Sequence, residues 1–145
     1  SMIDETRLID TNILIYAYDN SEKEKHEIAK GILAKCWRKE VIYALSTQNL
    51  SELFVNVTKK IQTPVPINEV EEDIKHIISF PYFKIFVINP NTVIIAIGIS
   101  SKFNISYWDA LIVSVMHENN IDTIITENEK DFKNIPWLTV INPFK

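Results

Sequence analysis

Short apolar runs alternate with longer stretches of helical periodicity over the whole chain. Five short runs have the length of buried strands, at residues 7–9, 41–45, 83–88, 122–125 and 138–141. The stretches between them predict helices at 13–18, 22–39, 47–61, 69–79, 90–102 and 107–118. Because strands that alternate with helices form a mostly parallel sheet, the pattern predicts a three-layer α/β sandwich, with a central sheet flanked by helices.

The chain shows no repeat, low-complexity tract or interdomain linker, and its length fits one domain. We therefore expect a single domain over residues 2–145, with Ser1 as part of a cloning remnant. Polar residues able to cap helices, among them Asn68 and Ser106, precede the predicted helices.

Composition excludes several classes of function. Apolar residues make up 46% and charged residues 23% of the chain, as in ordinary globular proteins. No apolar run approaches the roughly 20 residues that span a membrane, and the start lacks the order of a secretory signal, so we expect a cytoplasmic protein without a membrane partner. Cys36 is the only cysteine, which excludes a cysteine zinc site and indicates a buried side chain. The two glycines, Gly31 and Gly98, are too few for a phosphate-binding loop or a dinucleotide-binding turn.

The net charge is −4 and the isoelectric point about 5.4. These values argue against tight, nonspecific binding of nucleic acid, which depends on Lys and Arg displacing counterions. They are compatible with an enzyme that cleaves nucleic acid, because a carboxylate metal site is itself acidic and the metal offsets its charge.

Two polar clusters directly follow predicted strands. Asp10 ends the first strand, and Thr126, Glu127 and Asn128 follow the fourth. Ligands of open parallel sheets bind outside the carboxyl ends of the strands, so the two clusters can meet at one edge. Asp10 fits equally well as a simple cap of the next helix, and Asn12 is placed to hold its carboxylate.

Two further acids lie on predicted helices. Asp109 lies beside an apolar stripe in which Trp108, Ile112 and Val115 are expected to face the core. An unpaired buried carboxylate costs several kcal/mol, so Asp109 requires a cation, hydrogen bonds or a proton, unless it only occupies the first turn beside its cap. Glu52 projects opposite the apolar stripe of its own helix, and periodicity alone predicts a solvated side chain.

Four stretches, taken in their order and at their separations, resemble the PIN domain, specifically the VapC-like toxin ribonucleases of type II toxin–antitoxin systems. They are LIDTNILIYAYD, QNLSELF, ISYWDALIVSVM, and IITENEKDF with the terminal VINPF. The third stretch is the most specific of them. The resemblance covers essentially the whole chain and implies a PIN-like arrangement of the α/β sandwich.

The resemblance implies that Asp10, Glu52 and Asp109 are the catalytic acids and the ligands of Mg²⁺ or Mn²⁺. Members of the family often have a fourth acid at the position of Asn128, whose amide oxygen can coordinate a cation but adds no negative charge. The resemblance therefore gives auxiliary roles to a second set of residues. Within it, Glu127 or Asp131 could supply the missing negative charge. That set is Asn12, Thr126, Glu127, Asn128 and Asp131.

Mg²⁺ and Mn²⁺ prefer carboxylate oxygens, and they can activate water and neutralise phosphate charge. The resemblance thus implies a metal-dependent endoribonuclease that hydrolyses single-stranded or looped RNA to 5′-phosphate and 3′-hydroxyl ends. It also implies two protein partners. One is a cognate antitoxin that holds the enzyme inactive, and the other is a second copy of the chain in a homodimer.

Two other functions compete with this interpretation. A haloacid-dehalogenase-type phosphatase also has an Asp after its first strand, but it needs a second acid where this chain has Asn12. A degenerate PIN domain that binds RNA or protein without catalysis is the stronger alternative, because Asn128 weakens a metal site. Binding of Mg²⁺ or Mn²⁺ distinguishes the nuclease from the second alternative.

Overall fold

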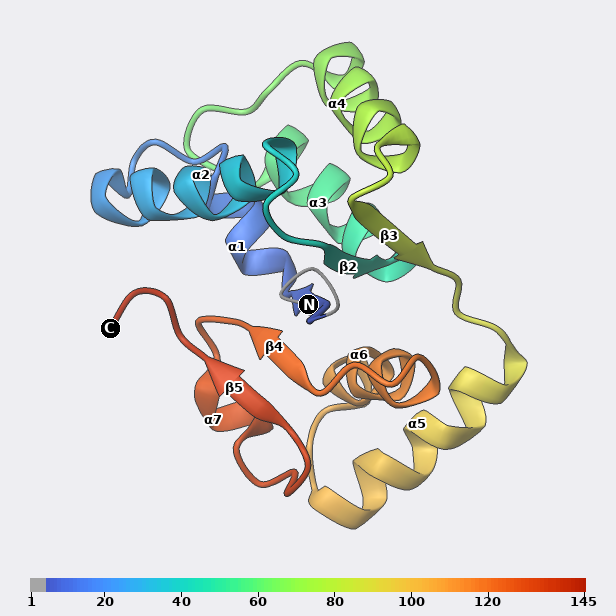
Figure 1. Cartoon of the computed structure of the whole chain (residues 1–145). Coiled ribbons are helices and arrows are strands. Elements are labelled where there is room, and N and C mark those ends of the chain that lie inside the picture. Colours follow the sequence, from blue (N-terminus) through green and yellow to red (C-terminus); the bar gives the residue numbers. More distant parts are fainter. Residues whose placement is uncertain (1–4) are drawn as a thin grey trace.

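The computed structural model describes residues 5–145 and is organised around one parallel sheet (Figure 1). The strands are β1 (Arg7–Ile9), β2 (Tyr43–Ser46), β3 (Phe83–Phe86), β4 (Thr123–Ile125) and β5 (Thr139–Ile141). The helices are α1 (Thr11–Tyr16), α2 (Lys23–Trp37), α3 (Thr47–Lys59), α4 (Ile67–Ser79), α5 (Pro90–Phe103), α6 (Tyr107–Glu118) and α7 (Glu129–Phe132). The expected remnant at Ser1 lies outside the described residues.

The five strands follow the order β3-β2-β1-β4-β5, and every neighbouring pair is parallel. The chain builds outward from β1 to β3 and then returns to place β4 on the other side of β1. The predicted parallel α/β sandwich is therefore confirmed, and the order of strands reverses between β1 and β4. Open sheets of this kind bind ligands beyond the carboxyl ends of their strands at such a switch point.

Helices cover both faces of the sheet. In Figure 1, α1–α4 lie on one side and α5–α7 on the other. Each face has its own core because successive strand residues point to opposite sides. Ile9 and Leu45 pack in the cluster with α1–α4, whereas their neighbours Leu8 and Ala44 pack in the cluster with α6 and α7. The predicted burial of Cys36 is confirmed in the first of these clusters.

The structure corrects two local predictions and adds one helix. Asn68 does not cap α4, because Pro66 occupies the cap position and its fixed φ begins the helix at Ile67. The short helix α7 was not predicted, since four residues are too few to show a helical period. The strands β2 and β3 are shorter than the apolar runs that predicted them.

Trp108 is also placed differently from its prediction in the core, because 64% of its surface is exposed. Leu111 and Ile112, one turn further along α6, are buried. The apolar stripe therefore enters the core only from the second turn of the helix, and Trp108 lies on the surface ahead of it. Within residues 5–145, no helix is long and apolar enough to cross a membrane.

Candidate functional site

Asp10 lies at the carboxyl end of β1, and only 6% of its surface is exposed. Its Oδ1 accepts a hydrogen bond from the Thr11 amide at 2.8 Å and thereby caps α1. Its Oδ2 accepts from Thr126 Oγ1 at 2.7 Å and from Asn12 Nδ2 at 3.1 Å. Asp10 thus caps a helix, and it also joins the clusters that follow β1 and β4.

The pKa of Asp10 is raised above its ordinary value. Burial is the main cause, because it disfavours the charged carboxylate. The hydrogen bonds from Thr126, Thr11 and Asn12 oppose this effect, while the nearby charge of Glu52 adds to it. A positive charge placed between Asp10 and Glu52 would stabilise both carboxylates.

Glu52 reaches this edge from the second turn of α3. Its Oε1 accepts a hydrogen bond from Thr11 Oγ1 at 2.9 Å, and the same hydroxyl accepts from Asn49 Nδ2 at 2.9 Å. Glu52 is partly exposed, and periodicity alone did not predict its contact with Thr11. Thr11, the residue after Asp10, therefore ties α3 to the end of β1.

Asn49 is fully buried, although it is a polar residue on the helix that carries Glu52. Its Oδ1 accepts from the Ser46 amide at 2.8 Å, and Ser46 Oγ in turn accepts from the Asn49 amide at 3.3 Å. This reciprocal capping box fixes the start of α3. A Ser followed three residues later by Asn is the signal from which this arrangement could have been anticipated.

Asp109 lies in the first turn of α6 and is half-buried. Its amide donates to Ser106 Oγ at 3.1 Å, which confirms the predicted cap. The pKa of Asp109 is raised, first by burial, against a hydrogen bond with Ser106 that lowers it. The charges of Asp131 and Asp10 raise this pKa further. Asp109 therefore experiences the charge of the acid after β1 and of an acid in α7.

The loop after β4 is fastened to α1 through hydrogen bonds. Thr126 is buried, and its Oγ1 accepts from the Asn128 amide at 3.0 Å while it donates to Asp10. The Glu127 amide donates to Asn12 Oδ1 at 3.2 Å. Asn12 thus contacts Asp10 with one end of its amide and the loop with the other, as its expected supporting role requires.

The carboxylate of Glu127 is engaged by two residues that the sequence did not single out. It accepts from the Tyr16 hydroxyl at 2.7 Å and from Lys25 Nζ at 2.5 Å. Burial raises the pKa of Glu127, but the contacts with Lys25 and Tyr16 outweigh burial and lower it overall. Of Glu127 and Asp131, the two acids considered for an auxiliary charge, Asp131 is the one whose charge raises the pKa of Asp109.

The described part of the chain contains no three His, Cys, Asp or Glu side chains close enough to hold a metal ion together. Asp10, Glu52 and Asp109 nevertheless share one edge of the sheet and influence one another's charge, Glu52 acting on Asp10 and Asp10 on Asp109. Mg²⁺ usually keeps several waters and takes one or two carboxylates directly. A cation at this edge would therefore contact at most two of these acids directly, with water completing its coordination.

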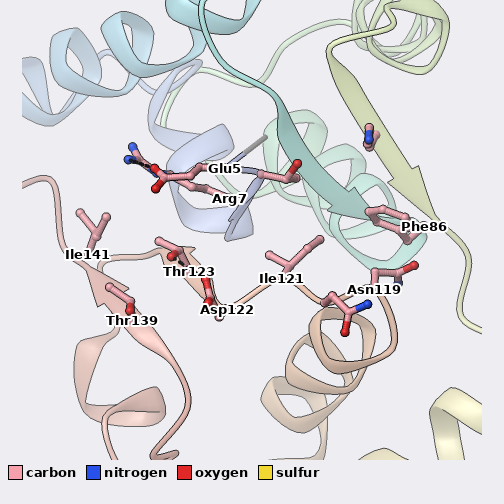
Figure 2. Close-up of a pocket in the computed structure, with 12 residues that line it drawn as sticks. Glu5, Arg7, Phe86, Asn119, Ile121, Asp122, Thr123, Thr139 and Ile141 are labelled. Atoms are coloured by element: carbon pink, nitrogen blue, oxygen red, sulfur yellow. Dashed lines mark hydrogen bonds and ion pairs between the residues drawn. The ribbon is translucent and has the colours of Figure 1, made fainter. Parts of the chain in front are cut away.

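Two hollows lie away from these acids. An apolar groove of about 690 Å³ runs between α2 and α4, with Leu33, Trp37 and Phe80 among its lining residues. A polar hollow of about 660 Å³ is lined by Arg7, Thr123 and other residues where strands begin (Figure 2). The polar hollow therefore lies at the opposite edge of the sheet from Asp10.

The fold and the site together define a class of protein, namely parallel α/β domains that collect acids beyond the strand ends at a switch point. Residues 7–138 match the family model described as the PIN domain, and the chain accordingly belongs to the PIN domain family. A search of curated protein sequences finds no match to this chain.

Several solved structures share the fold. A chain of a toxin–antitoxin complex from Klebsiella pneumoniae is 22% identical, with a TM-score of 0.62 over 94% of this chain and 97% of that one. A chain of VapBC2 from Rickettsia felis, bound to a promoter DNA fragment, is 22% identical, with a TM-score of 0.66 over 94% and 98%. A chain of FitAcB from Neisseria gonorrhoeae is 20% identical, with a TM-score of 0.67 over 94% and 97%.

Proposed function

We propose that this chain is a metal-dependent endoribonuclease that hydrolyses RNA in the cytoplasm, and that it is the toxin of a toxin–antitoxin pair. The observation that supports this best is the buried carboxylate of Asp10 at the switch point, hydrogen-bonded to Thr126 across the sheet. Membership of the PIN domain family supports the class of chemistry. The solved chains of similar fold come from toxin–antitoxin complexes, which supports the biological role.

Asp10, Glu52 and Asp109 would hold Mg²⁺ or Mn²⁺, which supplies the charge that activates water and stabilises the phosphate undergoing hydrolysis. The chain's own residues keep this set in place. Thr11 positions Glu52, and Thr126 and Asn12 orient Asp10 through its second oxygen. Burial around Asp10 and Asp109 raises the pKa of both carboxylates because it disfavours their charged forms, and a bound cation would offset that penalty.

We further propose an antitoxin and a second copy of the chain as protein partners. The groove between α2 and α4 offers apolar surface with Trp37 and Phe80, which suits an apolar segment of the antitoxin. Ile94 and Ile97 of α5 are more than half exposed, and such apolar surface suits contact between two copies.

A binding domain without catalysis is the competing function, and Asn128 is the observation that favours it. Among the described residues, the side chain of Asn128 makes no capping hydrogen bond to α7. It supplies no negative charge near Asp109 either. Asp131, which affects the pKa of Asp109, provides a charge at this side of the site.

The function is tested by incubating the purified chain with structured RNA in Mn²⁺, alongside Asp109→Asn and a sample with EDTA. We expect discrete cleavage by the wild type with 5′-phosphate ends, and a loss of at least about a hundredfold in rate for Asp109→Asn, because removal of a charged group at such a site typically costs that much.

Asp122→Asn is the matched control, because it makes the same substitution at an exposed position at the other edge of the sheet. We expect it to cleave as the wild type does. Cleavage that persists in EDTA, or that Asp109→Asn retains, would contradict the proposed site. Bound metal and bound RNA without cleavage would favour the binding domain.

A further inference from the structure

Trp108 is a large apolar side chain that the structure leaves largely in solvent beside the acids. It lies in the first turn of α6, directly before Asp109, and exposes 64% of its surface. Its ring packs edge-on against Tyr107, with ring centroids 5.4 Å apart, so Tyr107 supports its position. An aromatic face that is held in place and open to solvent is a surface on which a flat ligand can stack.

Gln48 reaches the same place from the first turn of α3. Its Nε2 donates to the backbone oxygen of Trp108 at 3.3 Å, which links the starts of α3 and α6. Its Oε1 is buried and has no hydrogen-bond partner, the one such side-chain atom within residues 5–145. The protein covers this atom, so the contribution of Gln48 to this place is its hydrogen bond to the backbone of Trp108.

Gln48 and Trp108 each lie close in sequence to one of the proposed catalytic acids. Gln48 precedes Glu52 by four residues, so the two lie on one face of α3. Trp108 and Asp109 are consecutive in α6. The exposed ring of Trp108 therefore belongs to the residue before one proposed acid, and its backbone is tied to the helix that carries another.

We propose that Trp108 forms a stacking subsite for one nucleobase of the RNA substrate. The base stacks on the Trp108 ring, and the hydrogen bond from Gln48 to the Trp108 backbone holds the start of the helix that carries this ring. Unpaired bases in RNA are bound by stacking on aromatic side chains. The inference rests on the proposed function, and it identifies a residue that binds substrate without being an acid of the site.

The test measures the binding of short, fluorescently labelled homopolymeric RNAs, with Ca²⁺ in place of Mn²⁺ to limit cleavage. We expect Trp108→Ala to weaken binding about tenfold or more, because stacking of one base on an aromatic side chain contributes that much. Trp108→Phe keeps a smaller aromatic face and should retain part of the affinity. Gln48→Met removes the hydrogen bond to the Trp108 backbone and keeps the approximate shape, so it should weaken binding less than Trp108→Ala does.

Trp137→Ala is the matched control. Trp137 is 38% exposed and packs against His117 at the other end of α6, with ring centroids 5.7 Å apart. We expect this variant to bind RNA as the wild type does. The melting temperature of each variant, with and without Mn²⁺, shows whether folding and metal binding are preserved.

The outcomes separate this inference from the proposed function. If the wild type binds metal and RNA and Trp108→Ala binds both equally well, the subsite alone is overturned. Conversion of a dimer to a monomer by Trp108→Ala in sedimentation would also overturn it, because Trp108 would then be a contact between copies. A wild type that binds neither RNA nor metal would contradict the proposed function itself.

Discussion

At the scale of single residues, Thr11 connects two of the proposed acids. Its hydroxyl donates to Glu52 and accepts from Asn49, and its amide donates to Asp10. The hydroxyl therefore makes one donor and one acceptor interaction inside the protein. Replacement of this one oxygen disturbs a proposed catalytic acid and a buried amide together.

Thr11→Val keeps the shape of the side chain and removes the hydroxyl. We expect the free energy of unfolding to fall by about 1–3 kcal/mol, because the Asn49 amide is left buried without its partner. We also expect weaker Mn²⁺ binding, because Glu52 loses the contact that positions it. Denaturation in urea and calorimetric titration with Mn²⁺ measure the two effects.

Thr11→Ser is the control, because it retains the hydroxyl and loses only a methyl group. It should preserve Mn²⁺ affinity at a smaller cost in stability. Equal behaviour of the Val and Ser variants in both measurements would show that the hydroxyl does not organise the site.

At the scale of elements, α2 carries a glycine where the fold does not require one. A Cβ at Gly31 would meet no atom within 4 Å, and its φ is not positive. Glycine in a helix interior is less favourable than alanine by about 0.8–1.0 kcal/mol. The helix is therefore less stable than its packing allows.

Gly31→Ala should raise the free energy of unfolding by up to about 1 kcal/mol and the melting temperature by about 2–4 °C. Gly31→Ser should give an intermediate gain, since serine lies between glycine and alanine in helix propensity. Thermal denaturation followed by circular dichroism measures both. A loss of stability in the alanine variant would mean that a methyl group at position 31 makes an unfavourable contact, contrary to the open space around Gly31.

Periodicity predicted the elements well where they are long, and less well at their ends. The parallel sheet follows from alternating strands and helices, and the meeting of Asp10 with Thr126 follows from where their strands end. The exposure of Trp108 did not follow, because a helical period shows which face is apolar but not at which turn the core begins. The burial of Asn49 did not follow either, because it depends on a cap that pairs with Thr11.

At the scale of the whole molecule, acids from separate parts of the chain share one edge of the sheet although the net charge is already −4. Their mutual repulsion and burial destabilise the metal-free fold. A cation that binds only the folded chain adds RT ln(1 + [L]/Kd), about 2.7 kcal/mol at a hundredfold excess over Kd. Metal binding should therefore be visible as a gain in stability.

We expect millimolar Mn²⁺ to raise the melting temperature of the wild type and of Asp122→Asn. We expect no comparable gain for Asp109→Asn, because that variant loses a ligand charge. Differential scanning calorimetry in Mn²⁺ and in EDTA measures the difference. If Mn²⁺ does not raise the melting temperature of the wild type, the acids do not form a metal site, and the proposed catalytic function is contradicted as well.

The hydrogen bond between Thr126 and Asp10 joins residues 116 positions apart in the sequence. During synthesis β1 emerges from the ribosome before β2 and β3, whereas its other neighbour β4 emerges after them. One side of β1 therefore remains an open strand edge until β4 is made, and in that interval the nascent chain is exposed to wrong pairing. For the same reason a nascent chain that has not passed β4 lacks a complete site, so the proposed activity begins only after β4 has been made.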